Sequence, residues 1–398
     1  MNILFVSENF PYPLDRGGHI RSASILKELS RQFSVTLLTG SGQAAGNHPG
    51  LNFFRQFCKK VICLPKPQMP AWKRGYYLLE GLVGGKPYPL NKNFSVPFLQ
   101  KIREELQSGD YQVLHCDHLD TAQYLYDLPK PIPCVFDTHN IIFLLMERMG
   151  QQEKSAIKRL YLHRNAQQLG KYEAEIWPLF DLCLVCSEQE AQQIGRFAPK
   201  AKTAVIPNGV DIDFYQTIAG TSPANPTLLF VGRLDYFPNT QGVLFFYQSV
   251  WPLLLGQIPQ IRWQIVGGVI PPALQELKKD ARIKISEKAT DMRPYLAAST
   301  ISIVPLHIGG GTRLKILEAM AVGLPVVSTA IGAEGIDAVN GQEIIIADQP
   351  QELAQQIIEL CKNADKRQKI ALAASSFVTR YDWQVIGKKL ISCYNDLK

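Results

Sequence analysis

The segment Val304–Thr329, which reads VPLHIGGGTRLKILEAMAVGLPVVST, combines the residue types that bind an anion. A short apolar run ends at Pro305, three consecutive glycines follow, and helical spacing begins near Thr312. Glycines let a backbone approach a ligand closely, and free N–H groups at the start of a helix point toward negative charge. We therefore expect this loop to bind phosphate, with Thr312 as the N-cap of the helix.

Two cations and a carboxylate follow on the predicted helix. Arg313 and Lys315 lie near its N-terminal end, where each disfavours the helix by about 0.3–1 kcal/mol. A bound diphosphate offsets this effect, because guanidinium and ammonium groups both bind phosphate oxygens. Glu318 lies among apolar residues and needs a partner if it is buried, either a ribose diol or a neighbouring Arg or Lys. The alternative for the loop is a glycine-rich turn with solvated charges.

Apolar runs that alternate with helical segments must position these residues. Residues 3–6 and 35–38 predict buried parallel strands, with helical spacing at residues 20–29 between them. The pattern recurs up to residue 186 and restarts at residue 227, after a stretch rich in Pro, Gly, Asn and Asp. We therefore expect an α/β protein with two Rossmann-like doubly wound domains facing a cleft, where ligands bind outside the carboxyl ends of the strands.

The composition excludes several classes of protein. Of 398 residues, 46% are hydrophobic and 19% are charged, which excludes a disordered chain. The net charge of +7 is too mild for a nucleic-acid binder and fits small anionic ligands or an anionic membrane surface. Eight scattered cysteines do not predict a disulfide framework, and Cys183 and Cys186 lack the second pair of a zinc site. Without a long apolar run or a signal peptide, we expect a cytoplasmic protein.

Glu318 and Ala319–Val327 resemble the nucleotide-sugar signature of glycosyltransferase family 4, in the GT-B superfamily. That signature has two glutamates separated by seven residues, and then an Ala-Met-Ala/Cys-x-Gly-x-Pro-Val-Val run. The resemblance implies that Glu318, which matches the second glutamate, binds the ribose of the donor nucleotide. Gly310 occupies the position of the first glutamate, which contacts the donor sugar in the family. In this respect the chain resembles a bacterial exopolysaccharide subgroup with a GGGTRLK-type loop.

A second segment, Phe230–Tyr236, resembles the family's strand that leads to a diphosphate-binding arginine, here Arg233. Pro238 occupies the position of the family's lysine, and we expect Lys315 to replace it. Tyr381–Trp383 resembles the start of the C-terminal helix that returns to the first domain.

The first half of the chain carries fewer matches. Gly17 and Gly18 follow the first predicted strand, and in the family this glycine pair reaches the donor phosphates. His139 resembles the histidine that touches the donor sugar near the reacting carbon, and its alternative is a hydrogen-bonded structural role. His115, Asp117 and His118 follow another predicted strand. Their spacing suggests a metal, but without a further ligand set we prefer a polar pocket on the acceptor side.

The resemblance implies a retaining, metal-independent hexosyltransferase that moves a sugar from a nucleotide diphosphate to an acceptor hydroxyl in polysaccharide or glycoconjugate synthesis, without a cofactor. The expected domains are an acceptor-side domain at 1–206 with a helix at 381–398, a linker at 207–226, and a nucleotide-sugar domain at 227–380. The expected catalytic residues are His139, Arg233 and Lys315. The expected donor-binding residues are Gly17, Gly18, Arg233, Gly310, Gly311, Thr312, Arg313, Leu314, Lys315 and Glu318.

Two other functions stay open, a non-catalytic scaffold that binds nucleotide sugars or glycans, and a nucleotide-sugar 2-epimerase. Gly310 favours the scaffold and disfavours the epimerase, because an epimerase needs carboxylates near the sugar. The expected partners are a nucleotide sugar and a glycan or lipid-linked acceptor, and not a nucleic acid. Two segments combine features that allow two interpretations, and they are Trp72–Leu90, which mixes cations with aromatic residues, and the apolar run Ile141–Met146. They predict either core packing with a solvated face, or peripheral contact with the inner face of the membrane.

Overall fold

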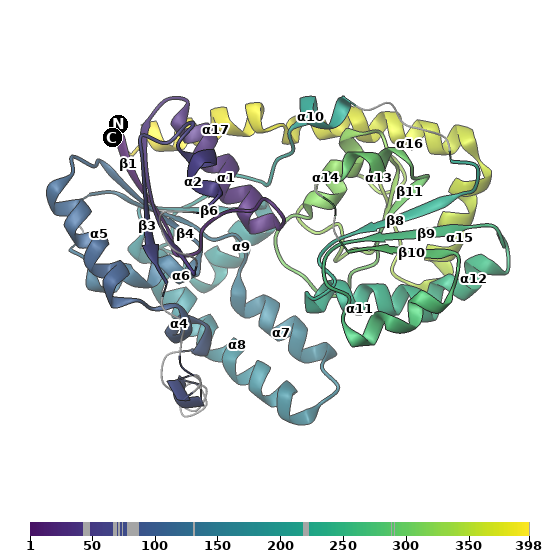
Figure 1. The fold of residues 1–398 in the computed structure, drawn as a ribbon, viewed down its shortest axis with the longest axis horizontal. Helices are drawn as coiled ribbons and strands as arrows, with labels where there is room; N and C mark the ends of the chain where they lie inside the picture. Colours follow the sequence, from purple (N-terminus) through teal and green to yellow (C-terminus); the bar gives the residue numbers. More distant parts are fainter. Residues whose placement is uncertain are drawn as a thin grey trace. The chain divides into compact units, whose positions relative to one another are not determined.

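The chain folds into two compact units, which Figure 1 shows as a ribbon. One unit comprises Met1–Pro207 together with Gln384–Lys398, and the other comprises Asn208–Trp383. The structure is a computed structural model. It describes residues 1–42, 48–66, 70, 72–73, 75–77, 87–129, 132–217, 223–287, 289 and 291–397. Residues 208–217, expected in the linker, belong to the second unit, and much of Trp72–Leu90 lies outside the described residues.

The first unit is built on a seven-stranded parallel sheet with the order β3-β2-β1-β4-β5-β6-β7. Its strands are β1 (Asn2–Ser7), β2 (Ser34–Ser41), β3 (Lys60–Pro65), β4 (Val113–Asp117), β5 (Cys134–Asp137), β6 (Leu182–Val185) and β7 (Thr203–Val205). The strand order reverses between β1 and β4, where a doubly wound sheet binds its ligands. The register places Ser7 beside Asp117 and Asp117 beside Asp137, all at the carboxyl ends of their strands.

Helices connect these strands, as parallel pairing requires. They are α1 (Gly17–Ser30), α2 (Gly50–Phe54), α4 (Tyr88–Asn93), α5 (Val96–Ser108), α6 (Leu119–Ala122), α7 (Ile142–Gln152), α8 (Ala156–Ile176) and α9 (Glu188–Phe197), with short turns η1 (Gln123–Asp127) and η2 (Trp177–Leu179). Ser155 and Ser187 cap α8 and α9, because each hydroxyl accepts a hydrogen bond from a first-turn N–H. Helix α17 (Trp383–Asn395) returns the chain to this unit.

The second unit repeats the plan with a six-stranded parallel sheet in the order β10-β9-β8-β11-β12-β13. Its strands are β8 (Thr227–Val231), β9 (Arg262–Val266), β10 (Ile283–Ser286), β11 (Ile301–Val304), β12 (Val326–Ser328) and β13 (Ile345–Ile346). Here the order reverses between β8 and β11. The glycine loop follows β11 directly, so it lies at the carboxyl edge where ligands are expected.

The helical segments of the second unit cover this sheet. They are α10 (Ile212–Gln216), α11 (Phe237–Phe245), η3 (Phe246–Val250), α12 (Trp251–Leu255), η4 (Pro272–Lys279), α13 (Arg293–Ala297), α14 (Leu314–Ala321), α15 (Pro350–Lys362), α16 (Ala364–Phe377) and η5 (Val378–Tyr381). The central strands of both sheets are apolar and almost fully buried, as in Ile3–Val6 and Leu228–Phe230, while β3 and β7 at the two edges of the first sheet are only partly buried. The prediction of two doubly wound α/β domains is therefore confirmed. Among the described residues, no helix has both the length and the apolar character needed to cross a bilayer.

Candidate functional site

The glycine loop of the second unit is folded around the side chain of Arg313. The guanidinium donates hydrogen bonds to the carbonyl oxygens of Gly310 and Gly311, the latter at 2.6 Å, and to that of Ile331 at 3.4 Å. A Cβ atom at Gly309 would lie 1.9 Å from Nη2 of Arg313, so a larger residue fits there only if the guanidinium moves. Arg313 therefore fixes the shape of the loop, a role that the sequence did not predict.

The helix after the loop begins later than predicted. Helix α14 starts at Leu314, and its N-cap is Arg313 without a capping side chain. The prediction that Thr312 caps this helix is wrong, because the Thr312 hydroxyl accepts a hydrogen bond from the backbone N–H of Asn208 at 3.4 Å. The Asn208 side-chain amide also donates to the Thr312 carbonyl at 3.3 Å. The N-terminus of α14 thus keeps first-turn N–H groups without a side-chain cap, which suits an anion.

Lys315 reaches from α14 to the end of β8. Its Nζ donates to Oδ1 of Asn239 at 3.1 Å and lies 4.4 Å from the centre of the Phe230 ring. The Asn239 amide nitrogen donates to the backbone carbonyl of Arg233 at 2.8 Å, so the first turn of α14 and the Arg233 segment share one hydrogen-bond chain. Burial and, to a smaller extent, the charge of Arg313 together lower the pKa of Lys315 to about 7, and the charge of Glu318 opposes them.

Arg233 follows β8 and is half-exposed, with its guanidinium paired to Asp235 through Nε at 3.0 Å and through Nη2. This pair lies in the segment that contacts Lys315 through Asn239. Sequence reasoning missed both Asp235 and Asn239, although both lie close to the resemblance at Phe230–Tyr236.

Glu318 lies one turn after Lys315 on α14, and its hydrogen-bond partner is the hydroxyl of Tyr215 on α10. Burial raises the pKa of Glu318, while the Tyr215 hydrogen bond and the charge of Lys315 oppose the rise. Among the described residues, the donor is therefore a tyrosine and not the predicted Arg or Lys, and Lys315 acts on Glu318 through its charge. Tyr215 was missed because it falls in the stretch expected to be a linker.

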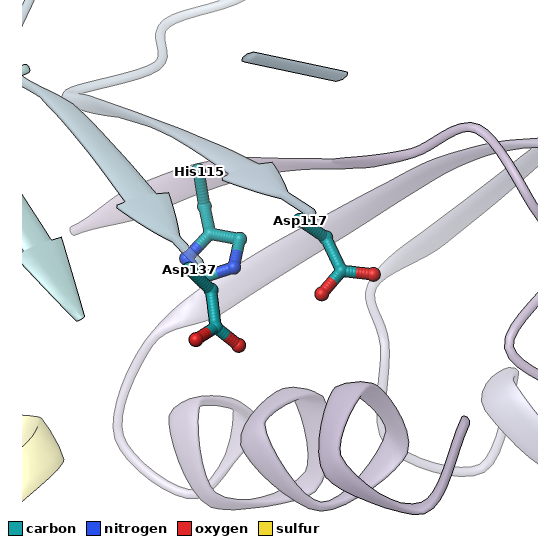
Figure 2. A group of neighbouring side chains, drawn as sticks. All are labelled: His115, Asp117 and Asp137. Atoms are coloured by element: carbon teal, nitrogen blue, oxygen red, sulfur yellow. The ribbon is translucent and has the colours of Figure 1, made fainter. Parts of the chain in front are cut away.

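At the carboxyl edge of the first sheet, two carboxylates point to the same side. Figure 2 shows Asp117 at the end of β4 and Asp137 at the end of β5, together with His115. His139 lies 2.8 Å from Asp117 and 3.3 Å from Asp137, measured from its Nε2. Arg21 on α1 donates to both oxygens of Asp137, through Nε at 3.0 and 2.9 Å. Arg21 was missed because its partner lies 116 residues away along the chain.

Asp117, Asp137, His139 and Arg21 form a buried charged cluster. Its charges balance, because two anions face two cations. Burial would lower the pKa of His139, but Asp137 and Asp117 outweigh burial and raise it to about 9. Burial would also raise the pKa of both aspartates, but His139 and, for Asp137, Arg21 hold both pKa values below the usual range. At neutral pH, His139 and Arg21 are therefore cations and both aspartates are anions.

The predicted residues Gly18 and His139 lie together. A Cβ atom at Gly18 would lie 3.4 Å from Nδ1 of His139, and α1 begins at this glycine pair. His139 has a φ of +55°, which directs its ring toward the start of α1. Ser22 on α1 donates to Asp117 at 2.8 Å, which holds the helix against the cluster.

The three residues expected on the acceptor side separate in the structure. The His115 ring stacks on Phe5, and its Nδ1 is hydrogen bonded to the Tyr394 hydroxyl of α17, so it is fully buried. Asp117 is buried in the charged cluster. His118 keeps a partly exposed ring beside His139, with the two ring centres 5.3 Å apart.

His115, Asp117 and Asp137, the side chains drawn in Figure 2, also offer three ligand atoms. These atoms all lie within 4.8 Å of one another. Oxygen and imidazole ligands of this kind can hold a divalent ion. However, His139 and Arg21 already neutralise both carboxylates, so the cluster does not need a cation for charge balance.

Glu8 is a further residue at this edge that sequence reasoning missed. It follows β1 directly and is 2% exposed, and neither carboxylate oxygen has a hydrogen-bond partner in the described part of the chain. The ammonium group of Lys66 lies 3.7 Å away. Burial raises the pKa of Glu8 to about 8, and Lys66 opposes this rise. Its position directly after the first strand was the signal that could have found it.

Comparison with known families gives two matches. Residues 17–214 match the model of Glycosyltransferase Family 4, and residues 225–363 match that of Glycosyl transferases group 1. A 44.6 kDa protein of the cps region of Klebsiella pneumoniae is 24% identical, and the match covers 98% of both chains. The phosphatidyl-myo-inositol mannosyltransferase of Mycolicibacterium smegmatis is 25% identical over 82% of this chain and 83% of its own.

Solved structures share the fold across the whole chain. The sucrose-phosphate synthase of Thermosynechococcus elongatus has a TM-score of 0.75 at 18% identity, covering 100% of this chain and 98% of its own. HepE of Anabaena, in complex with UDP and glucose, has a TM-score of 0.70 at 16% identity and covers 100% of both chains.

Proposed function

Because the chain belongs to glycosyltransferase family 4 and has the GT-B fold, we propose that it is a retaining, metal-independent hexosyltransferase. It transfers a sugar from a nucleotide diphosphate to an acceptor hydroxyl in polysaccharide or glycoconjugate synthesis. One observation carries this proposal: at the carboxyl edge of the second sheet, Arg313 holds the glycine loop, and Lys315 and Glu318 follow on the helix that the loop leads into.

The second unit holds the donor. The diphosphate lies against the uncapped start of α14, where Lys315 and Arg233 supply positive charge. Arg313 acts mainly by binding the carbonyl oxygens of Gly310 and Gly311, so that the loop backbone keeps its shape and these oxygens do not face the diphosphate. Glu318, already oriented by Tyr215, accepts from the ribose hydroxyls. Gly310, Gly311, Thr312 and Leu314 supply the backbone of this cradle.

The chemistry consists of stabilising the charge that develops on the leaving diphosphate. Preorganised cations and N–H groups in a site of low dielectric do this without reorganisation during the reaction. Lys315, Arg233 and the helix N-terminus take the part that a metal ion plays in other transferases. Retention requires the acceptor hydroxyl to attack from the side that the diphosphate leaves, so an oxygen of the leaving phosphate accepts its proton.

The first unit contributes His139 and the Gly17–Gly18 pair. As an imidazolium, His139 donates from Nε2 to Asp117, and its Nδ1–H has no partner among the described residues. That N–H, beside the start of α1, donates to an oxygen of the donor sugar or phosphate. His118, with its partly exposed ring, lies on the acceptor side.

The acceptor is a glycan or a lipid-linked saccharide. The mycobacterial relative is named for a phosphatidyl-myo-inositol acceptor, which supports an acceptor that carries lipid. Such an acceptor requires the enzyme to work at the inner face of the membrane, as a peripheral protein in the cytoplasm.

Donor binding is tested by calorimetry with UDP, GDP, ADP and dTDP and with their glucose and mannose conjugates. Nucleotides with one of these bases are expected to bind. Arg233→Ala is expected to lower the affinity for that nucleotide diphosphate by about tenfold, which corresponds to one hydrogen bond between charged groups. Arg282→Ala is the matched control, because Arg233 and Arg282 are each 38% exposed and each paired to an aspartate two residues away. Equal affinity in wild type and Arg233→Ala would contradict the proposed cradle.

A non-catalytic scaffold is the second candidate, because Gly310 replaces the glutamate that contacts the donor sugar in the family. The two functions are separated by sugar release from the donor that binds. Release of free sugar or its transfer to an added glycan supports the enzyme. Tight donor binding without release over many hours supports the scaffold.

A further inference from the structure

Helices α7 and α8 form a hairpin with an exposed tip. Figure 1 shows them side by side, with the connecting turn at the end farthest from the strands of the first unit. The run Ile141–Met146, one of two considered for membrane contact, begins this hairpin, but Ile141 and Phe143 are buried in the core. The exposed apolar residues lie instead at the start of α8.

Ile157 and Leu160 are 83% and 69% exposed, although both are large aliphatic residues. They are three residues apart on α8, so they lie on one face of its first turns. Large exposed apolar side chains that lie together on a protruding element commonly mark an interaction site.

The start of α8 is predominantly basic, although Glu153 lies in the turn before it and Glu147 lies on α7. From Lys154 to Lys171 the chain has no Asp or Glu, and it has five exposed cations. None of these cations has an ion-pair partner in the part of the chain that the structure describes. They are Lys154, Lys158, Arg159, Arg164 and Lys171.

We infer that this surface, the α8 tip, docks the protein on an anionic lipid bilayer. Ile157 and Leu160 enter the boundary between headgroups and acyl chains, and the flanking cations contact anionic headgroups. A second copy of the chain is a poor occupant, because an isologous contact would set like charges against each other. Another protein is also disfavoured, since the cores of protein interfaces are depleted in lysine.

This inference deepens the proposed membrane contact and rests on it, but it does not depend on sugar transfer. Vesicle binding needs no donor or acceptor, so its failure and the failure of the proposed catalysis give different results.

The test is co-sedimentation of the full chain with vesicles of phosphatidylglycerol and phosphatidylcholine in equal parts, and with pure phosphatidylcholine. Binding is expected to the anionic vesicles and to fall steeply with added salt, because headgroup attraction is screened. Ile157→Ser with Leu160→Ser, and separately Lys158→Glu with Arg159→Glu, are each expected to reduce binding by about tenfold or more.

Helix α16 supplies a matched control, since Leu372 is 65% exposed and Lys369 lies three residues before it. Leu372→Ser with Lys369→Glu is expected to bind like the wild type. Equal loss in the control and tip variants, or full binding by the tip variants, would overturn the inference. So would binding to pure phosphatidylcholine that equals binding to the anionic vesicles. Dimerisation that the tip variants abolish, without vesicle binding, would assign the surface to a second copy instead.

Discussion

The ammonium group of Lys315 lies 3.1 Å from the amide oxygen of Asn239, and the amide nitrogen of Asn239 donates to the backbone of Arg233. This relationship joins the first turn of α14 to the segment after β8. It also places an ammonium group with a pKa of about 7 where we propose that a diphosphate binds.

Donor binding should therefore depend on pH through Lys315. A bound diphosphate stabilises the charged ammonium, so binding takes up a proton above pH 7, and affinity falls by up to about tenfold per pH unit. Calorimetry at pH 6 to 9, in buffers of different ionisation enthalpy, measures the affinity and the proton uptake together. Lys315→Met should bind weakly with a flat profile, while Lys369→Met should keep the wild-type slope. A wild-type profile that is flat across pH 7 would contradict this assignment.

Gly309→Ala should disturb the donor site through Arg313. The new Cβ would lie 1.9 Å from the guanidinium, which must leave its hydrogen bonds to the loop carbonyls. We expect a loss of about 1–3 kcal/mol in unfolding free energy and weaker donor binding, measured by urea denaturation and calorimetry.

Gly195→Ala is the control for Gly309→Ala, because a Cβ at Gly195 on α9 meets no atom within 4 Å. Helix propensity predicts a gain of about 0.5–1 kcal/mol there. Donor affinity that survives Gly309→Ala unchanged would show that the loop can hold its shape without these hydrogen bonds.

Glu8→Gln should stabilise the protein at alkaline pH. Burial raises the folded pKa of Glu8 to about 8 from its ordinary value of 4.5, so the native state holds a proton that the unfolded state releases. Below pH 4.5 the carboxyl is therefore protonated in both states and does not change the pH dependence of the unfolding free energy. As pH rises to about 8, it lowers the unfolding free energy increasingly.

Urea unfolding at pH 5, 7 and 9 measures this effect. The advantage of Glu8→Gln should be larger at pH 9 than at pH 5 by about 1–3 kcal/mol, the penalty for a buried polar group without partners. Glu276→Gln, at an exposed position of the second unit, should match the wild type at each pH. A constant difference between Glu8→Gln and wild type would mean that Glu8 is solvated.

Arg21→Met should destabilise the first unit strongly. It leaves the buried carboxylate of Asp137 with His139 as its remaining cation, and breaking a buried ion pair costs about 3–5 kcal/mol. Arg21→Met with Asp137→Asn should recover much of this loss in chemical denaturation. Arg16→Met, which breaks an exposed pair with Asp15 at 3.3 Å, should cost less than about 1 kcal/mol. Additive effects of the two buried substitutions would contradict the pairing.

Local patterns predicted the fold and the glycine loop, since buried strands such as Ile3–Val6 show in short stretches of sequence. The details that were wrong depend on distant residues. Thr312 does not cap α14 because Asn208, 104 residues away, takes its hydroxyl. His115 is buried beside Tyr394, 279 residues away. The protonation of His139 depends on aspartates from two strands, which no spacing rule brings together.

The hydrogen bond between His115 and Tyr394 also has a consequence for synthesis. The ribosome completes β1 to β7 before it has made any of the second unit, yet the first unit needs α17, which follows the second unit in sequence. The buried imidazole of His115 therefore waits for its partner while 279 further residues are translated, at roughly 5–20 residues per second. The first unit cannot finish folding in the order of its synthesis, and its final packing step comes after the second unit has left the ribosome.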